Sequence, residues 1–190
     1  MTLLIAGLIL FFGAHFISIV ALPWRDRMAA RIGEQPWKGL YSLVAIAGFV
    51  LMLWGYGEAR HSPFVLYSPP FWLRHVTALL MLPVFVLLFA AYLPGRIKTA
   101  MKHPMLAATK MWAFAHLLSN GTLGDVLLFG SFLVWAVADR ISLKRRPQRP
   151  IRTAPSGRFN DIIAVVLGLA AYVAFALWLH VRWIGVSPLP

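Results

Sequence analysis

The stretch TLLIAGLILFFGAHFISIVAL, residues 2–22, is apolar along its whole length apart from His15 and two hydroxyl residues. A helix rises about 1.5 Å per residue, so 21 residues reach across the hydrocarbon core of a bilayer, which is about 30 Å thick. The stretch has no basic segment before it and no small-x-small cleavage site after it, so we expect a retained anchor rather than a cleaved signal peptide.

Further apolar segments of similar length follow this one along the chain. The chain of 190 residues is 60% hydrophobic and only 13% charged, too apolar for a domain with a wetted surface. The sequence therefore predicts an all-α integral membrane bundle of about six transmembrane helices, forming a single domain over residues 1–190. We expect the six helices at residues 2–22, 37–57, 72–93, 104–120, 123–138 and 161–181.

The basic residues indicate how the helices cross the membrane. The formal net charge is +12, and of the 18 lysines and arginines only Arg60, Arg74 and Arg182 fall outside three alternate loops. This asymmetry is typical of cytoplasmic loops and predicts a multi-pass membrane protein with both termini on the non-cytoplasmic side. It also assigns the positive charge to topology and membrane lipid rather than to nucleic acid, and makes residues 140–160 a basic cytoplasmic linker.

Histidines are the main candidates for chemistry, because the chain has no cysteine and any metal must bind through nitrogen or oxygen. We expect His61, His75, His103 and His180 to lie in loops or outermost helical turns, where water or headgroups satisfy them. That leaves His15 and His116 deep in the membrane. His15 lies about 20 Å from the outer start of its helix and His116 about 18 Å from the inner start of its own. In a hydrocarbon core about 30 Å thick, their depths therefore differ by less than about 10 Å.

Two deep imidazoles on different helices match the needs of a six-coordinate b-type haem. Neighbouring small residues such as Gly7 and Ala113 let a helix or a flat cofactor come close. The alternative is that each imidazole only hydrogen-bonds a neighbour and holds helices together. Aromatic residues could line a porphyrin pocket, and basic residues could hold its propionates: Phe11, Phe12, Trp112 and Phe114, with Arg60, Arg74 and Lys110.

Several long motifs resemble the NnrU family of bacterial membrane proteins. They are FFGAHFISIVALPWRDRMAARIG, WKGLYSLVAIAGFVLMLWGYGEAR, PPFWLRHV, AYLPGRIKTAMKHPMLAATKMWAFAHLLSNG and VWAVADRISLKRR. The resemblance covers the chain up to about Arg146. It implies a multi-pass protein of the bacterial inner membrane with a role in denitrification and nitric oxide metabolism. The same domain occurs in the 15-cis-zeta-carotene isomerase of plastids and cyanobacteria, which is a haem b enzyme.

The resemblance also implies ligands. The axial histidines of that isomerase lie in motifs similar to GAHFIS and WAFAH, which places the haem iron on His15 and His116 as metal and cofactor-binding residues. The isomerase motif has a cysteine three residues before its second histidine, where this chain has Ala113. Because that cysteine is tied to redox switching, its absence weakens the case for isomerase chemistry while haem binding stays possible.

We compared four functions with these features, and the sequence supports two of them. The first is a haem b protein that isomerises an apolar polyene or serves nitric oxide metabolism. The second is an accessory or assembly protein without a cofactor, for a respiratory or denitrification membrane complex. A transporter lacks the expected internal repeat. A membrane methyltransferase, suggested by KHP at residues 102–104, lacks acidic residues after Asp161. No catalytic residue is predicted.

Two acidic residues flank the fifth apolar segment. Asp125 stands near its outer start, where a negative charge is favoured by the helix dipole. Asp139 lies beside Arg140 at the inner interface, and we expect an exposed ion pair between these neighbours.

Overall fold

A computed structural model describes residues 1–147, 149 and 151–189 of the chain. Every regular element in these residues is helical, and the described part contains no β-strand, only one isolated bridge between Val65 and Thr122. The predicted all-α class is therefore confirmed. The basic linker expected over residues 140–160 includes Gln148 and Pro150, which lie outside the described residues.

Six long helical segments correspond to the six predicted ones. They are α1 (Thr2–Val20), α3 (Glu34–Ala59), α4 (Leu73–Tyr92), α6 (Pro104–Ser119), α7 (Leu123–Ser142) and the continuous run of α8 (Asn160–Ala174), a π-helical turn (Phe175–Leu179) and α9 (His180–Ile184). Two shorter helices lie between them. These are α2 (Leu22–Ile32) and α5 (Arg96–Met101), which the apolar pattern of the sequence did not predict.

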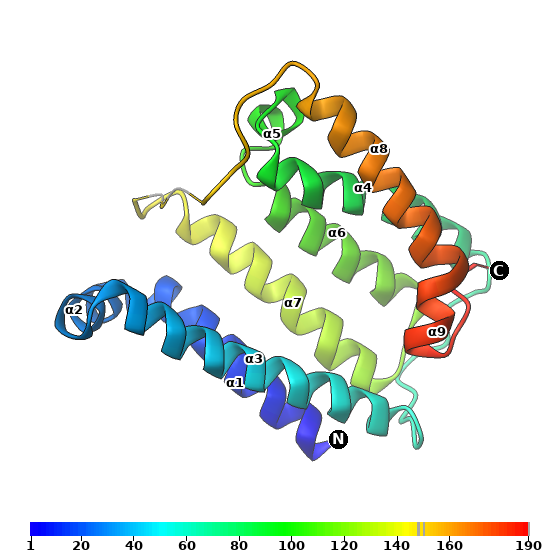
Figure 1. Cartoon of the computed structure of the whole chain (residues 1–190). Coiled ribbons are helices and arrows are strands. Elements are labelled where there is room, and N and C mark those ends of the chain that lie inside the picture. The colour runs from blue at the N-terminus through cyan, green and yellow to red at the C-terminus, as the bar shows by residue number, and fades with distance from the viewer. Residues whose placement is uncertain (148, 150, 190) are drawn as a thin grey trace.

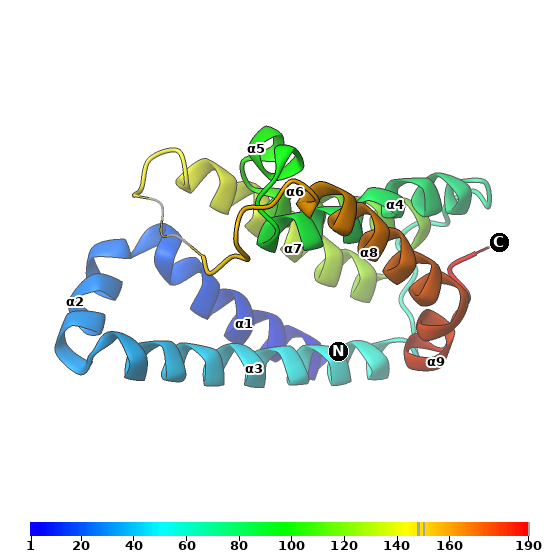
Figure 2. The ribbon, with the colours of Figure 1, turned by 45° about the horizontal axis from the view of Figure 1, so that its top comes forward.

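The helices follow one another across the bundle in an order set by their contacts. α3 packs on α1, α1 on α7, α7 on α6, α6 on α4 and α4 on α8 (Figures 1 and 2). Consequently α7 separates the α1–α3 pair from α6. The helices α2 and α5 lie at the end of the bundle where α7 finishes, whereas the N-terminus and α9 lie at the other end (Figure 1).

Four helical segments are long and apolar enough to span a membrane: α1, α3, α4 and the Asn160–Ile184 run. α6 has 16 residues and is about 24 Å long, which is shorter than the hydrocarbon core. In α7 every stretch of 18 residues contains Asp125, Asp139 and Arg140. The short length of α6 and the three charged residues of α7 therefore exclude these two helices from the four candidate membrane spans. Six crossings and outward termini therefore stay predictions.

Glycines allow α1 and α3 to pack with their backbones almost touching. A Cβ placed on Gly55 of α3 would lie 2.1 Å from the backbone nitrogen of Leu4, and one on Gly48 would lie 2.5 Å from that of Phe11. On α1, a Cβ on Gly7 would lie 2.3 Å from the backbone nitrogen of Met52. Close helix packing of this kind is typical of membrane interiors, and it fixes the position of α1 and hence of His15.

Candidate functional site

His15 lies in α1 at the junction with α3 and α7. Its Nδ1 atom is 2.7 Å from the carbonyl oxygen of Phe11, one helical turn earlier. Its ring stacks on the Phe11 ring at 4.1 Å between centroids and meets the rings of Trp135 and Tyr41 at 5.4 Å each. A carbonyl oxygen only accepts hydrogen bonds, so Nδ1 carries the proton and donates, which leaves the Nε2 lone pair of His15 free.

His116 repeats this arrangement in α6. Its Nδ1 atom donates to the carbonyl oxygen of Trp112 at 2.8 Å. Its ring stacks on Phe129 of α7 with 4.6 Å between centroids, and the Trp112 ring lies 5.3 Å away. The Nε2 lone pair of His116 is free for the same reason as that of His15. Each imidazole is therefore held in the tautomer that a metal ligand needs.

A row of aromatic contacts connects the two histidines. From Phe11, beside His15, the row passes to Phe132 of α7 at 5.5 Å and from there to Trp112 of α6 at 5.2 Å, next to His116. Of the four predicted aromatics, Phe11, Phe12 and Trp112 lie at this junction. Phe12 meets Phe132 at 5.0 Å. Phe114 is exposed and belongs to another face of α6.

The two imidazoles lie on opposite flanks of α7 and at different levels along it. His15 lies beside Trp135 and His116 beside Phe129, which are six residues or about 9 Å apart along the helix. This offset agrees with the depth difference expected from the sequence. Nitrogen ligands on opposite sides of one metal are only about 4 Å apart, twice a bond of about 2 Å. The structure thus places both histidines along one row of rings without bringing them into contact.

The donor atoms nevertheless suit a haem iron. Both Nε2 atoms are unprotonated donors among apolar and aromatic side chains, and neither histidine lies in a larger metal-binding cluster. No group of three or more His, Cys, Asp or Glu side chains that could hold a metal occurs in the described ranges. A haem needs only one or two axial ligands from the protein, so the donor chemistry fits this cofactor. Haem ligation by His15 and His116 stays a prediction.

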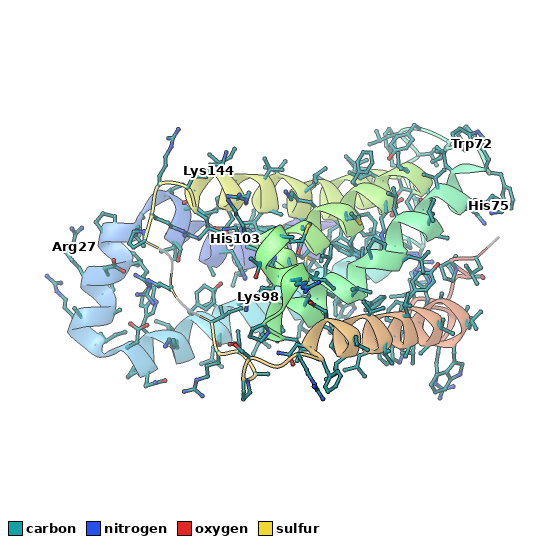
Figure 3. All side chains as sticks on the ribbon, turned by 90° about the horizontal axis from the view of Figure 1, so that it is seen from above. Arg27, Trp72, His75, Lys98, His103 and Lys144 are labelled. Atoms are coloured by element: carbon teal, nitrogen blue, oxygen red, sulfur yellow. The ribbon has the colours of Figure 1, made fainter. Side chains whose placement is uncertain are left out.

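The other four histidines lie at the ends of the bundle, as the sequence suggested. His61 and His75 are exposed, and Figure 3 shows His75 beside Trp72 at the end opposite Arg27. His103 directly precedes α6 at its N-cap position, where its side chain makes no capping hydrogen bond. The Nδ1 atom of His180 donates to the carbonyl oxygen of Val186 at 2.6 Å, so protein rather than water satisfies it.

Two of the basic residues suggested as partners of the haem propionates make contacts at the loop between α3 and α4, residues 60–72. The Arg60 guanidinium donates to the carbonyl oxygen of Ile184 at 2.6 Å, and that of Arg74 lies over the Phe71 ring at 5.2 Å. Lys110 is partly buried on α6. These contacts do not favour any one of the three basic residues as the partner of a haem propionate.

The loop between α3 and α4, residues 60–72, covers the end of α6 nearest His116. The Tyr67 hydroxyl donates to the carbonyl oxygens of Leu117 at 2.5 Å and Asn120 at 2.8 Å, which lie at the C-terminus of α6. Burial raises the pKa of this hydroxyl, so it keeps its proton and remains a donor over a wide pH range. A Cβ on Gly121 would lie 1.9 Å from the Tyr67 carbonyl oxygen, so only glycine fits this close contact.

Asp125 forms a buried polar network that the sequence predicts only in part. It lies at the third position of α7, where it and Thr122 form a capping box, as the helix-dipole argument led us to expect. The carboxylate is 5% exposed and also accepts a hydrogen bond at 2.6 Å from the Tyr56 hydroxyl of α3. The Tyr56 ring in turn meets Phe129, which stacks on His116. This network ties α3 to α7 beside the histidine.

Removing the Tyr56 hydroxyl should destabilise the bundle. In Tyr56→Phe the buried Asp125 carboxylate loses one donor, which costs about 1–3 kcal/mol, and we expect a lower melting temperature of the detergent-purified protein. Tyr92→Phe is the matched control, because the Tyr92 side chain is half exposed and makes no hydrogen bond in the described residues. Equal melting temperatures for the two variants would show that the Tyr56–Asp125 bond contributes nothing to stability.

The expected Asp139–Arg140 ion pair was wrong. Asp139 instead accepts from Arg146 at 2.5 Å, and both side chains are mostly buried. Sequence neighbours on a helix point in different directions, whereas residues seven apart return to the same face. Arg146 also donates to the carbonyl oxygen of Ser18 at 2.5 Å, so this pair joins the C-terminal ends of α1 and α7.

These features define an α-helical membrane protein with two histidines that are each held by the carbonyl oxygen four residues earlier. The family model described as NnrU protein matches residues 3–188, so the chain belongs to the NnrU family. No curated protein and no solved structure matches the chain.

Proposed function

We propose that this NnrU protein binds haem b within the bacterial inner membrane, with His15 and His116 as axial ligands. In this proposal all six long helical segments cross the membrane and both termini lie outside. The observation that carries it is the shared state of the two imidazoles: each Nδ1 is tied to the carbonyl four residues earlier, and each Nε2 is left as a free donor atom. Histidine ligands of metals typically have their second nitrogen fixed in this way.

Haem held by both histidines would supply a one-electron redox change, whereas binding of nitric oxide or an apolar double bond would require His15 or His116 to leave the iron. The chain's own part is to hold two neutral imidazoles, to surround them with aromatic side chains and to exclude water. Because the rings lie on opposite flanks of α7 and are offset by about 9 Å along it, ligation of one iron by both requires α1 and α6 to shift along α7 as well as towards one another. The proposed substrate class is then an apolar polyene or a nitrogen oxide, as the resemblance of the sequence motifs implies.

The packing of the two histidine rings supports one alternative function, that of an accessory protein without a cofactor. Each imidazole is stacked on a phenylalanine ring, as an ordinary core side chain would be. Under this alternative the histidines only hold helices together, and the protein assists a respiratory or denitrification complex. It predicts a colourless protein and near-normal function in His15→Gln and His116→Gln.

The haem content of the purified protein distinguishes the two. The full chain is expressed in cells supplied with haem, purified in detergent, and assayed by extraction into alkaline pyridine. We expect about one haem b per chain. A monodisperse preparation with less than about a tenth of that amount would overturn the haem proposal and favour the accessory protein.

A further inference from the structure

We propose that a groove between the inner ends of α1 and α7 binds one anionic phospholipid, with its phosphate on Arg145. The groove has a volume of about 480 Å³. α1 contributes Ser18 and Ile19 to its walls, Leu22 follows from the start of α2, and α7 with the turn after it contributes Ala138, Ile141, Ser142, Arg145 and Arg146. It lies one to two helical turns from His15 and is a separate site from the aromatic row.

The charge of the groove is positive. None of its lining residues is acidic, and two of them are arginines. Arg146 is held in place by Asp139 and by the Ser18 carbonyl oxygen, so its charge is largely compensated and its role is to join the two helices. Arg145 is exposed, and its guanidinium has no hydrogen bond or ion pair within the described part of the chain. A guanidinium of this kind can bind a phosphate through two parallel hydrogen bonds.

Apart from Ser18 and Ser142, the remaining walls are apolar, which identifies the kind of anion. Ile19, Leu22 and Ile141 give the groove a hydrocarbon surface next to the arginine, and Ile141 is half exposed there. A soluble phosphate would leave this surface in water, whereas a phospholipid covers it with an acyl chain. The combination of an arginine with apolar helix surface at a membrane boundary is typical of anionic lipid sites.

The position of the groove in the bundle supports the same occupant. Figure 3 shows Arg27, Lys98 and Lys144 on the side of the molecule away from Trp72 and His75. The groove therefore opens at the end where basic residues from α2, α5 and the end of α7 gather. Anionic headgroups are attracted to such a surface, and the groove gives one of them a defined place.

The test compares phosphatidylglycerol with phosphatidylcholine on the full chain in detergent, by native mass spectrometry at 0.15 M salt, where distant surface charges are screened at about 8 Å. Arg145→Gln should weaken binding of the first phosphatidylglycerol at least about tenfold, because it removes a charge-assisted contact. Lys144→Gln is the matched control. Lys144 is the neighbouring exposed cation but does not line the groove, and we expect a change of about twofold or less.

A second variant tests the positive charge of the groove without replacing the arginine. Ile141→Glu places a negative charge beside Arg145 and should abolish the preference for phosphatidylglycerol over phosphatidylcholine. Equal losses in Arg145→Gln and Lys144→Gln would overturn the proposal, because binding would then follow overall charge rather than a site. Equal binding of the two lipids by the wild type would overturn it as well.

Discussion

Gly55→Ala should separate α1 from α3 and strongly destabilise the bundle. The new Cβ would lie 2.1 Å from the backbone nitrogen of Leu4 and 2.5 Å from the carbonyl carbon of Leu3. Backbone atoms cannot move aside as a flexible side chain can, so the helices must shift. Overpacking of this kind costs about 3 kcal/mol. For a chain of this size, that lowers the melting temperature by roughly 6–12 °C.

Gly57→Ala provides the control on the same helix. A Cβ at Gly57 meets nothing within 4 Å, so the added methyl group only improves helix propensity. Its melting temperature should equal or slightly exceed that of the wild type. If Gly55→Ala and Gly57→Ala have the same melting temperature, the close α1–α3 contact is wrong, and so is the position of His15 that follows from it.

His15→Ala and His116→Ala should each abolish stable haem binding. Changing a residue that merely supports a ligand commonly costs 10–100-fold in metal affinity, so loss of the ligand itself should lower haem content at least about tenfold. His75→Ala is the matched control, because His75 is an exposed histidine in the first turn of α4, away from the aromatic row. Its haem content should equal that of the wild type.

Folding has to be measured in parallel for these variants. His15→Gln and His116→Gln keep polarity and approximate size, so we expect melting temperatures of the haem-free proteins close to that of haem-free wild type. A variant that loses haem while keeping this stability identifies a ligand. If only one of the two positions affects haem content, a single histidine binds the iron and the other holds helices together.

Much of the fold could be predicted because each long helix is a continuous apolar segment. The predicted starts of α1, α6 and α7 are the same residues as in the structure. The short helices α2 and α5 were missed because both are rich in basic residues and carry no apolar run. The sequence LPWRDRMAARI of α2 does have proline at its start, which was a usable signal for a helix N-terminus.

The candidate site could be predicted only where its signal is local. A histidine inside an apolar helix stands out by itself, and so does an acidic residue at a helix start. The Tyr56–Asp125 bond joins residues 69 positions apart, so nothing in the local pattern reveals it. The seven-residue spacing of Asp139 and Arg146 was visible in the sequence, and helix geometry would have favoured it over the adjacent Arg140.

Electron paramagnetic resonance of the oxidised, purified wild type is the decisive measurement for whether His15 and His116 bind one haem iron. Two imidazoles in the axial positions give a strong ligand field, so we expect a low-spin ferric signal that is lost in both His15→Ala and His116→Ala. A high-spin ferric signal in the wild type, or a preparation without haem, would show that the two histidines do not share an iron.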